Sequence, residues 1–280
     1  MSVEFNARIG MVNFINTAAL YEVWKETVHH PEWQVVEAAP AELNRMLHDG
    51  ELDLGFVSSC EYAEHPERYR LLADLSISST GAVGSVFLFS ELEPQRLTDQ
   101  VVSLSPQSKT SNGLIKIILE DFYGVRPQYH LPTAVEGKQE GRAVLAIGDQ
   151  ALRLKSQDRF PFVLDLGEVW YRQTGLPFVF AVWAVREEFC CRQAKCLLEI
   201  HRELKRCVAR GRECLPTISR RVAPQVPMEA LACFSYLQGI ELDLNPDKIQ
   251  GLALFYEYLI RRGEASPQAL PLKIYQTTIG

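Results

Sequence analysis

Short apolar runs, polar loops and amphipathic helical patterns follow one another through roughly the first 120 residues of the chain. The apolar runs that read as buried strands are residues 8–12, 33–37 and 52–57. A helix begins at Ala18, and residues 40–50 form another, with Pro40 at its opening and Gly50 at its end. Strand, polar loop and helix therefore alternate, which predicts an α/β fold.

The alternation continues beyond this region and then gives way to helices. Further strands are expected at residues 71–79, 85–89, 101–105, 143–147, 162–166 and 176–185. From Glu187 to about Arg262 the pattern is almost wholly helical. Because a strand resumes at 176–185 after an inserted unit, we predict two lobes, the first formed by residues 1–90 together with 184–280 and the second by residues 91–183. Two crossovers between the lobes would form a hinge.

The segment 101–119 is the most informative for function, because it reads as a strand, a hydroxyl-rich turn and a helix. Helix N-termini carry partial positive charge and unpaired N–H groups, which favour carboxylate or phosphate ligands. A simpler interpretation is that Ser108, Thr110 or Ser111 only caps the helix. Other predicted strands also end in polar loops, and ligands of open α/β sheets bind at those ends. The pattern therefore predicts a cleft for a small polyanion.

Composition narrows the class of protein. The chain has 280 residues, 47% hydrophobic content, 23% charged residues and a formal net charge of −6, values ordinary for a globular enzyme or binding protein. We expect no nucleic-acid partner. The seven cysteines include no Cys-x-x-Cys pair, which is typical of reduced thiols and not of a zinc site. With no apolar leader and no membrane-length apolar run, a cytoplasmic location away from membranes is expected.

Several loops taken together resemble one enzyme family. The motifs are, in order, Gly10-x-Val12-Asn13-Phe14-Ile15-Asn16-Thr17, Gly50-Glu51-Leu52-Asp53-Leu54-Gly55-Phe56-Val57-Ser58-Ser59, Gly84-Ser85-Val86, Ser108-Lys109-Thr110-Ser111, Ile147-Gly148-Asp149 and Trp170-x-x-x-Thr174-Gly175-Leu176-Pro177-Phe178. As an ordered set they are similar to the motifs of chorismate dehydratases, which open the futalosine route to menaquinone. The family usually has a proline where this chain has Ala18-Ala19.

The resemblance implies a fold and a reaction. The fold is α/β and two-lobed, of the periplasmic-binding-protein-like type II, with a ligand cleft between the lobes and a helical C-terminal segment. The reaction removes water from chorismate, a small-molecule partner, to give 3-[(1-carboxyvinyl)oxy]benzoate. Because aromatisation of the ring drives it, no cofactor or metal is expected. The sequence agrees, since it offers neither a Gly-x-Gly-x-x-Gly fingerprint nor a metal-ligand cluster.

Candidate site residues follow from the same motifs. Asn16 and Ser85, matched by position to the family's active-site Asn and Ser, are the catalytic candidates and would contact the ring hydroxyl or the reacting carbon. The substrate-binding candidates are Ser58, Ser59, Ser108, Thr110, Ser111, Asn112, Gly148 and Asp149. An Asn side chain does not titrate near neutral pH, so Asn16 would orient groups and stabilise charge and would not act as an ordinary base.

The motifs leave the identity of the proton acceptor open. Asp149 and Glu168 are the carboxylates nearest to the motifs, but a carboxylate in the pocket would repel a dianionic substrate. We therefore favour the substrate's own enolpyruvyl carboxylate as the base, with Asp149 ordering a turn or pairing with a nearby Lys or Arg. Trp170 and Phe178 either stack on the ring or belong to the core, where such aromatics are more common.

Two other functions stay open at this point. One is a small-anion solute-binding or sensing protein of the same fold, acting without chemistry. The other is the sister enzyme of the futalosine pathway, which acts on a cyclic futalosine derivative. Its first loop looks like a Ser-Pro-Cys-Pro-Asn-Asp run, and this chain lacks that run.

Overall fold

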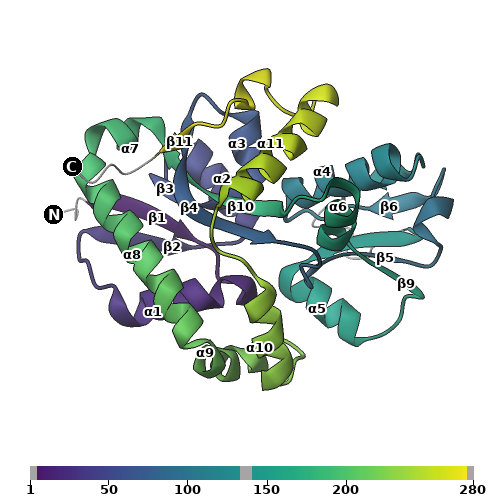
Figure 1. The fold of residues 1–280 in the computed structure, drawn as a ribbon, viewed down its shortest axis with the longest axis horizontal. Helices are drawn as coiled ribbons and strands as arrows, with labels where there is room; N and C mark the ends of the chain where they lie inside the picture. Colours follow the sequence, from purple (N-terminus) through teal and green to yellow (C-terminus); the bar gives the residue numbers. More distant parts are fainter. Residues whose placement is uncertain (1–4, 133–140, 276–280) are drawn as a thin grey trace.

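The computed structural model describes residues 5–132 and 141–275, which form two β-sheets flanked by helices (Figure 1). Met1 to Glu4, part of the N-terminal segment considered above for a leader, lie outside the described residues. Within the described ranges, no helix is both long enough and apolar enough to cross a membrane.

The first sheet holds the N-terminal strands and one late strand. In spatial order it contains β11 (Ile274–Tyr275), β4 (Tyr69–Ser79), β10 (Phe178–Arg186), β3 (Leu54–Ser58), β1 (Ala7–Met11) and β2 (Trp33–Glu37). β1 runs parallel to β2 and β3, whereas β10 is antiparallel to both β3 and β4. Every residue of β3 is buried, as expected for a strand covered on both faces.

The second sheet is formed by the inserted segment. In spatial order it contains β7 (Gln128–His130), β6 (Val101–Ser103), β8 (Ala143–Ile147), β5 (Val86–Ser90) and β9 (Phe162–Asp165). The chain enters this sheet between β4 and β5 and returns between β9 and β10, so the two expected crossovers are present. The lobe boundaries near residues 90 and 184 stay a prediction.

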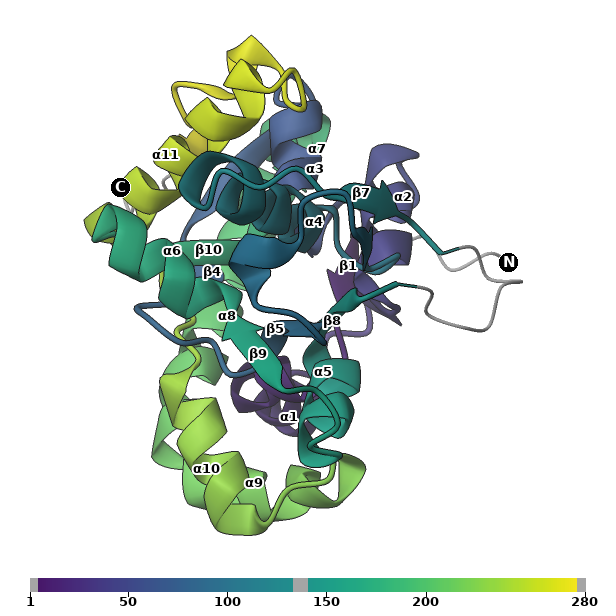
Figure 2. The ribbon, with the colours of Figure 1, turned by 90° about the vertical axis from the view of Figure 1, so that its right-hand side faces the viewer.

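Helices cover both sheets (Figures 1 and 2). They are α1 (Ala18–Thr27), α2 (Pro40–His48), α3 (Ser59–Glu64), α4 (Lys109–Lys116), α5 (Gly148–Ser156), α6 (Leu166–Thr174), α7 (Glu187–Arg192), α8 (Ala194–Glu213), α9 (Leu215–Val222), α10 (Ala230–Gly239) and α11 (Pro246–Arg261). Short helical turns are η1 (Ile15–Thr17), η2 (Pro94–Arg96), η3 (Ile117–Phe122), η4 (Ala223–Gln225) and η5 (Pro267–Ala269).

The C-terminal segment contacts both lobes. Its helix α11 packs Phe255 against Trp170 of α6, while α8 lies along α1. Figure 2 shows α5 near the corner formed by α9 and α10, where Arg153 donates a hydrogen bond of 2.9 Å to the carbonyl of Gln225. The C-terminal helices therefore connect the two sheets.

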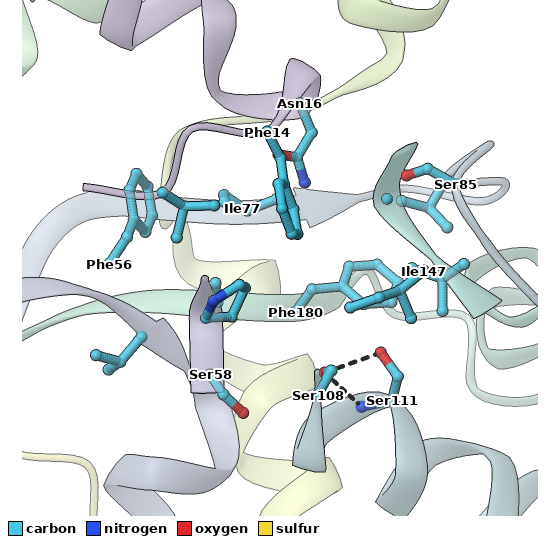
Figure 3. A pocket seen from close by; sticks show the side chains of 17 residues that line it. Phe14, Asn16, Phe56, Ser58, Ile77, Ser85, Ser108, Ser111, Ile147 and Phe180 are labelled. Carbon is cyan, nitrogen blue, oxygen red and sulfur yellow. Dashed lines mark hydrogen bonds between the residues drawn. The ribbon is translucent and has the colours of Figure 1, made fainter. Parts of the chain in front are cut away.

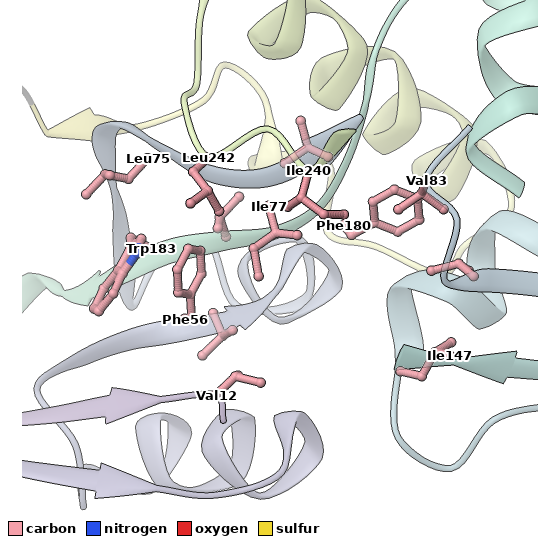
Figure 4. Packing of buried hydrophobic residues seen from close by; sticks show 14 of the residues in the cluster. Val12, Phe56, Leu75, Ile77, Val83, Ile147, Phe180, Trp183, Ile240 and Leu242 are labelled. Atoms are coloured by element: carbon pink, nitrogen blue, oxygen red, sulfur yellow. The ribbon is translucent and has the colours of Figure 1, made fainter. Parts of the chain in front are cut away.

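One buried cluster runs from the first sheet into the second (Figure 4). It extends from Trp183 and Phe56 through Phe180 to Ile147. Leu242 belongs to an extended segment that pairs with β4, where the Ser76 N–H donates to the Leu242 carbonyl at 3.1 Å. This short extended stretch interrupts the region from Glu187 to about Arg262, which is otherwise mainly helical, as expected.

Element boundaries differ from the sequence prediction where a side chain caps a helix. Helix α4 begins at Lys109, within the predicted hydroxyl-rich turn, because the Ser108 hydroxyl accepts the Ser111 N–H at 3.1 Å. Leu166, predicted to end a strand, begins α6, because the Asp165 carboxylate accepts the Glu168 N–H at 3.1 Å. Gly148 begins α5 directly after β8. β7 and β11 were not predicted at all.

Candidate active-site cavity

An apolar cavity lies where the two sheets meet and has a volume of about 610 Å³, counting the space that opens to solvent. Its walls include the rings of Phe14 and Phe180 (Figure 3). Of the predicted site residues, those that line it are Asn16, Ser58, Ser85, Ser108, Ser111 and Gly148. None of the described residues along these walls is charged.

The start of α4 contributes two hydroxyls. Ser108 caps the helix through its oxygen and donates its own proton to the Ser111 hydroxyl at 3.1 Å (Figure 3). The Ser111 oxygen accepts this bond, so its proton is left for a ligand in the cavity. The capping and binding interpretations of this segment are therefore compatible, because Ser108 caps the helix and orients Ser111 at the same time.

Ser58, at the end of β3, reaches the cavity from the first sheet. Its hydroxyl lies 2.5 Å from the hydroxyl of Thr110, which also accepts the Cys60 N–H at 3.0 Å. Thr110 is fully buried and outside the lining, so in this arrangement it positions Ser58 and joins α4 to the first sheet. Ser59 points elsewhere and donates to the Val179 carbonyl at 2.7 Å.

Asn112 and Asp149 also bond away from the cavity. The Asn112 side chain accepts the Ser105 N–H at 2.9 Å and donates to the Ser105 carbonyl at 2.8 Å, which clamps the loop before α4. Asp149 accepts the Ile15 N–H at 3.4 Å and so links α5 to η1. Burial raises the pKa of the Asp149 carboxyl. These contacts are structural, and the predicted binding roles of both residues rest on the motif resemblance alone.

Asn16 presents an unsatisfied polar atom. Its side-chain oxygen is buried and has no hydrogen-bond partner within the described ranges. Figure 3 shows its amide on the opposite side of the cavity from Ser108 and Ser111. The turn that carries it is held by Thr17, whose hydroxyl donates to the Val12 carbonyl at 2.7 Å. A buried oxygen without a partner is costly, which is the pattern expected of a group that meets a ligand.

Gly148 is placed by a steric requirement. Its φ is +54°, and a Cβ at this position would lie 3.1 Å from the ring of Phe14. The Gly148 N–H donates to the Ser85 carbonyl at 2.8 Å, which fixes the start of α5 against β5. Glycine therefore allows the Phe14 ring to close one wall of the cavity.

Ser85 has a partner that the sequence did not indicate. The hydroxyl of Tyr236, from α10, donates to the Ser85 hydroxyl at 2.9 Å. Burial raises the pKa of the Tyr236 phenol, so the group stays protonated at neutral pH. Tyr236 was missed because it lies in a helical pattern far along the chain from every motif, and nothing in its neighbourhood marks it.

The loop before Ser85 is held by a buried carboxylate. Asp165 accepts the Val83 N–H at 3.1 Å and the Gly84 N–H at 2.7 Å in addition to capping α6. Burial raises the pKa of Asp165, although these backbone donors act in the opposite direction. Gly84 has a φ of +75°, and a Cβ there would lie 3.3 Å from the Tyr236 ring. Glycine at position 84 thus leaves room for the Tyr236 ring of α10 to lie close to the loop that carries Ser85.

The remaining candidates lie outside the cavity. Glu168 is paired with Arg172 on the outer side of α6. Trp170 is fully buried and packs against Phe178, with ring centroids 5.2 Å apart, so both belong to the core in this arrangement. The aromatic walls of the cavity come from Phe14, Phe56 and Phe180, which were not singled out from the sequence.

Two sheets, two crossovers and a cavity between them define the two-lobed periplasmic-binding-protein-like class of fold. A protein of Archaeoglobus fulgidus solved by crystallography is similar with a TM-score of 0.74 and 17% identity, covering 92% of this chain and 97% of that one. The periplasmic aliphatic sulphonate-binding protein of Escherichia coli gives a TM-score of 0.68 and 14% identity, covering 99% and 94%. The expected fold class is confirmed.

Sequence comparison then assigns the family. Residues 7–261 match the family described as menaquinone biosynthesis. A chorismate dehydratase of Thermus thermophilus is 32% identical over 274 residues, covering 90% of this chain and 94% of the relative. A chorismate dehydratase of Campylobacter jejuni is 30% identical over 192 residues, covering 67% and 69%. The chain belongs to this menaquinone biosynthesis family of enzymes, as the motif resemblance predicted.

A more distant relative represents the sister activity. The 1,4-dihydroxy-6-naphtoate synthase of Thermus thermophilus is 24% identical over 245 residues, covering 82% of this chain and 84% of the relative. The lower identity favours the dehydratase interpretation over the sister enzyme.

Proposed function

We propose that this chain is a chorismate dehydratase, a hydro-lyase that converts chorismate to 3-[(1-carboxyvinyl)oxy]benzoate and water. The observation that carries the proposal is the Asn16 side chain, which lies across an apolar cavity from the Ser108–Ser111 pair and whose oxygen has no hydrogen-bond partner among the described residues (Figure 3). The choice of chorismate as substrate rests on the relatives named chorismate dehydratase. The proposal includes a cytoplasmic location, in keeping with a biosynthetic activity.

Binding of the substrate would rely on neutral donors. Chorismate carries two carboxylates, and the lining offers hydroxyls of Ser58, Ser85 and Ser111 but no Lys or Arg among its described residues. Hydroxyl donors at the start of α4 act together with the partial positive charge of that helix end. We assign one carboxylate to the Ser111 hydroxyl, with Ser58 and Asn16 available for the rest of the molecule.

The apolar walls favour a substrate-derived base. A carboxylate removed from water is a stronger proton acceptor, because desolvation disfavours its charged form. In the proposed step the enolpyruvyl carboxylate takes the proton from the ether-bearing ring carbon. The C–H electron pair forms the new ring double bond, the neighbouring C–O bond breaks, and the departing hydroxyl leaves as water with a proton returned by that carboxyl. The amide N–H groups of Asn16 and the hydroxyl of Ser85 would donate to the departing oxygen and stabilise its charge.

A single incubation tests the proposal. Purified protein with chorismate and no added metal or nucleotide should give the enolpyruvyl benzoate, detected by chromatography and mass. A matched incubation with the cyclic futalosine derivative is the control for the sister activity. Chorismate that is unchanged after hours at micromolar protein would instead favour a solute-binding or sensing protein.

Ser111→Ala should weaken substrate binding. The change removes a hydroxyl proton aimed at a carboxylate, and one charge-assisted hydrogen bond is worth roughly 1.5–3 kcal/mol, or about ten- to a hundredfold in affinity. The backbone cap to Ser108 is retained, so the helix should persist. Dissociation constants from calorimetry measure the effect. Ser156→Ala, at the exposed end of α5, is the matched control and should change nothing.

Tyr236→Phe should lower kcat with little change in KM. The ring is kept, but Ser85 loses a hydrogen bond worth roughly 0.5–1.5 kcal/mol, so kcat should fall about two- to tenfold. Steady-state kinetics and thermal melting are measured together. The exposed Tyr171→Phe serves as the control. A Tyr236→Phe enzyme with wild-type kcat would show that this contact does not position Ser85 for reaction.

Asp149→Asn and Glu168→Gln test for a base supplied by the protein. Both carboxylates bond away from the cavity, so each variant should retain kcat within about threefold, a change near 0.6 kcal/mol. Single-turnover rates and chorismate affinity are the measurements. Loss of turnover in a folded variant that still binds chorismate would assign the base to that carboxylate and overturn the substrate-assisted mechanism.

A further inference from the structure

A cluster of potential metal ligands lies beside the candidate active site. His48 is the last residue of α2. Glu61 lies in α3, and His65, four residues after Glu61, is the C-cap residue of that helix. One ligand atom from each of the three side chains lies within 4.8 Å of the other two, and His48 Nδ1 is 3.8 Å from Glu61 Oε1. The two imidazole rings are 4.4 Å apart at their centroids. The sequence did not suggest a metal site, because His48 is distant in the chain from the other two residues.

The cluster has unmet electrostatic needs. The Glu61 side chain is 5% exposed, and the hydrogen bond it accepts in the described structure comes from the Tyr69 hydroxyl at 2.9 Å. His48 Nδ1 is buried and has no hydrogen-bond partner among the described residues. A cation bound between them would neutralise the carboxylate and use the free imidazole nitrogen, so one ligand would satisfy both groups.

Nearby basic side chains are already paired. Lys109 bonds to Glu64 at 2.5 Å. Arg45 is bound to Glu42, with further carboxylates at Asp49 and Glu51. Neither Lys109 nor Arg45 therefore pairs with the Glu61 carboxylate. A bound cation could supply the positive charge that this carboxylate lacks.

We propose that His48, Glu61 and His65 bind one divalent transition-metal ion, with Zn²⁺ as the best match. Two imidazoles and one carboxylate are a common zinc donor set, with bonds near 2.1 Å. Tetrahedral ligands at such bonds lie roughly 3.4 Å apart, so the side chains need to close by about 1.4 Å or less. The fourth position would take water from the open surface hollow that these residues share with Gln107 and Ser108.

The site would be separate from substrate chemistry. Ser108 lines both this hollow and the candidate active-site cavity, so the metal would lie next to the reaction and outside it. By joining the end of α2 to α3, it would fix two elements that flank Ser58 and the α4 loop. The inference rests on the cluster's own geometry and holds whether or not the chain acts on chorismate.

The test uses the full chain after treatment with a chelator and buffer exchange. Titration with Zn²⁺ by calorimetry should show one ion per chain, and Co²⁺ should give visible d–d bands without a thiolate charge-transfer band. Loss of an outer partner of a metal ligand costs 10- to 100-fold in affinity, so His65→Gln, which removes a ligand, should weaken Zn²⁺ binding at least about a hundredfold.

Two further variants secure the interpretation. Glu61→Gln keeps an acceptor for Tyr69 but removes the charge, and it should weaken binding in a protein whose circular dichroism is unchanged. Cys191→Ser removes an exposed thiol and should leave affinity unchanged. Absence of stoichiometric binding, or binding that survives both His65→Gln and Glu61→Gln, would overturn the proposal.

Discussion

Asn16→Ala is expected to lower kcat for chorismate about a hundred- to a thousandfold, while the dissociation constant changes by a small factor. The side-chain oxygen of Asn16 is buried and has no hydrogen-bond partner among the described residues, and the amide faces the Ser108–Ser111 pair across the cavity. Removing one preorganised group that stabilises transition-state charge typically costs about 10²–10³ in kcat. The loss should fall on kcat, because an amide directed at the departing oxygen is used more strongly in the transition state than in the ground state.

The measurement separates binding from chemistry. Calorimetry gives the affinity for chorismate, and single-turnover experiments give the rate of the chemical step. Asn13→Ala is the matched control, because Asn13 is exposed in the same loop and donates to Glu37 at 2.8 Å, away from the cavity. If Asn16→Ala weakened affinity as much as it lowered turnover, the amide would be a binding group and the assigned role would be wrong.

The gathering of polar residues at the cavity was predictable because it depends on the direction of the strands. Residues 12–17, Ser58 and the loop before α4 follow strands of two sheets, and their ends face the same space. In α/β sheets this edge is where ligands bind, so motifs at strand ends converge without any knowledge of side-chain detail. The sequence also indicated that Ser108 lies at the N-terminus of a helix. The hydrogen bond by which Ser108 caps α4 agrees with that expectation.

Partners that come from distant parts of the chain could not be predicted in the same way. Tyr236 meets Ser85 only because α10 folds back over the second lobe, and a helical pattern does not reveal what its face will contact. His48 approaches Glu61 only once α2 packs against β3, the strand that leads into α3. Both contacts depend on tertiary packing, whereas periodicity reports only which face of an element is apolar.

The division between binding and supporting hydroxyls was also beyond the sequence. Thr110 and Ser111 are neighbours in one motif, but on a helix they point in different directions. Thr110 is turned toward Ser58 and Cys60, and Ser111 toward the cavity. A motif identifies the segment that forms a site, while helix geometry decides which of its members can touch a ligand.

Gly211→Ala should strongly destabilise the fold. Helix α8 crosses α1 at this glycine, and a Cβ there would lie 1.5 Å from the carbonyl oxygen of Ala19. The obstruction is backbone, so no side chain can rotate away, and the helices would have to separate. Overpacking typically costs 1–3 kcal/mol, and a backbone clash this close should exceed about 3 kcal/mol. At roughly 2–4 °C per kcal/mol, the melting temperature should fall by at least about 6 °C.

Thermal melting followed by circular dichroism checks this, with Gly239→Ala as the matched control. Gly239 ends α10, and a Cβ there meets no described residue within 4 Å, so alanine should be neutral or stabilise by up to about 1 kcal/mol through its helix propensity. The contrast isolates the α1–α8 contact from any general effect of replacing a helical glycine. Because α8 leads through α9 to α10 and Tyr236, Gly211→Ala should also lower turnover in whatever fraction folds. A Gly211→Ala protein that melts with the wild type would show that α8 does not lie this close to α1.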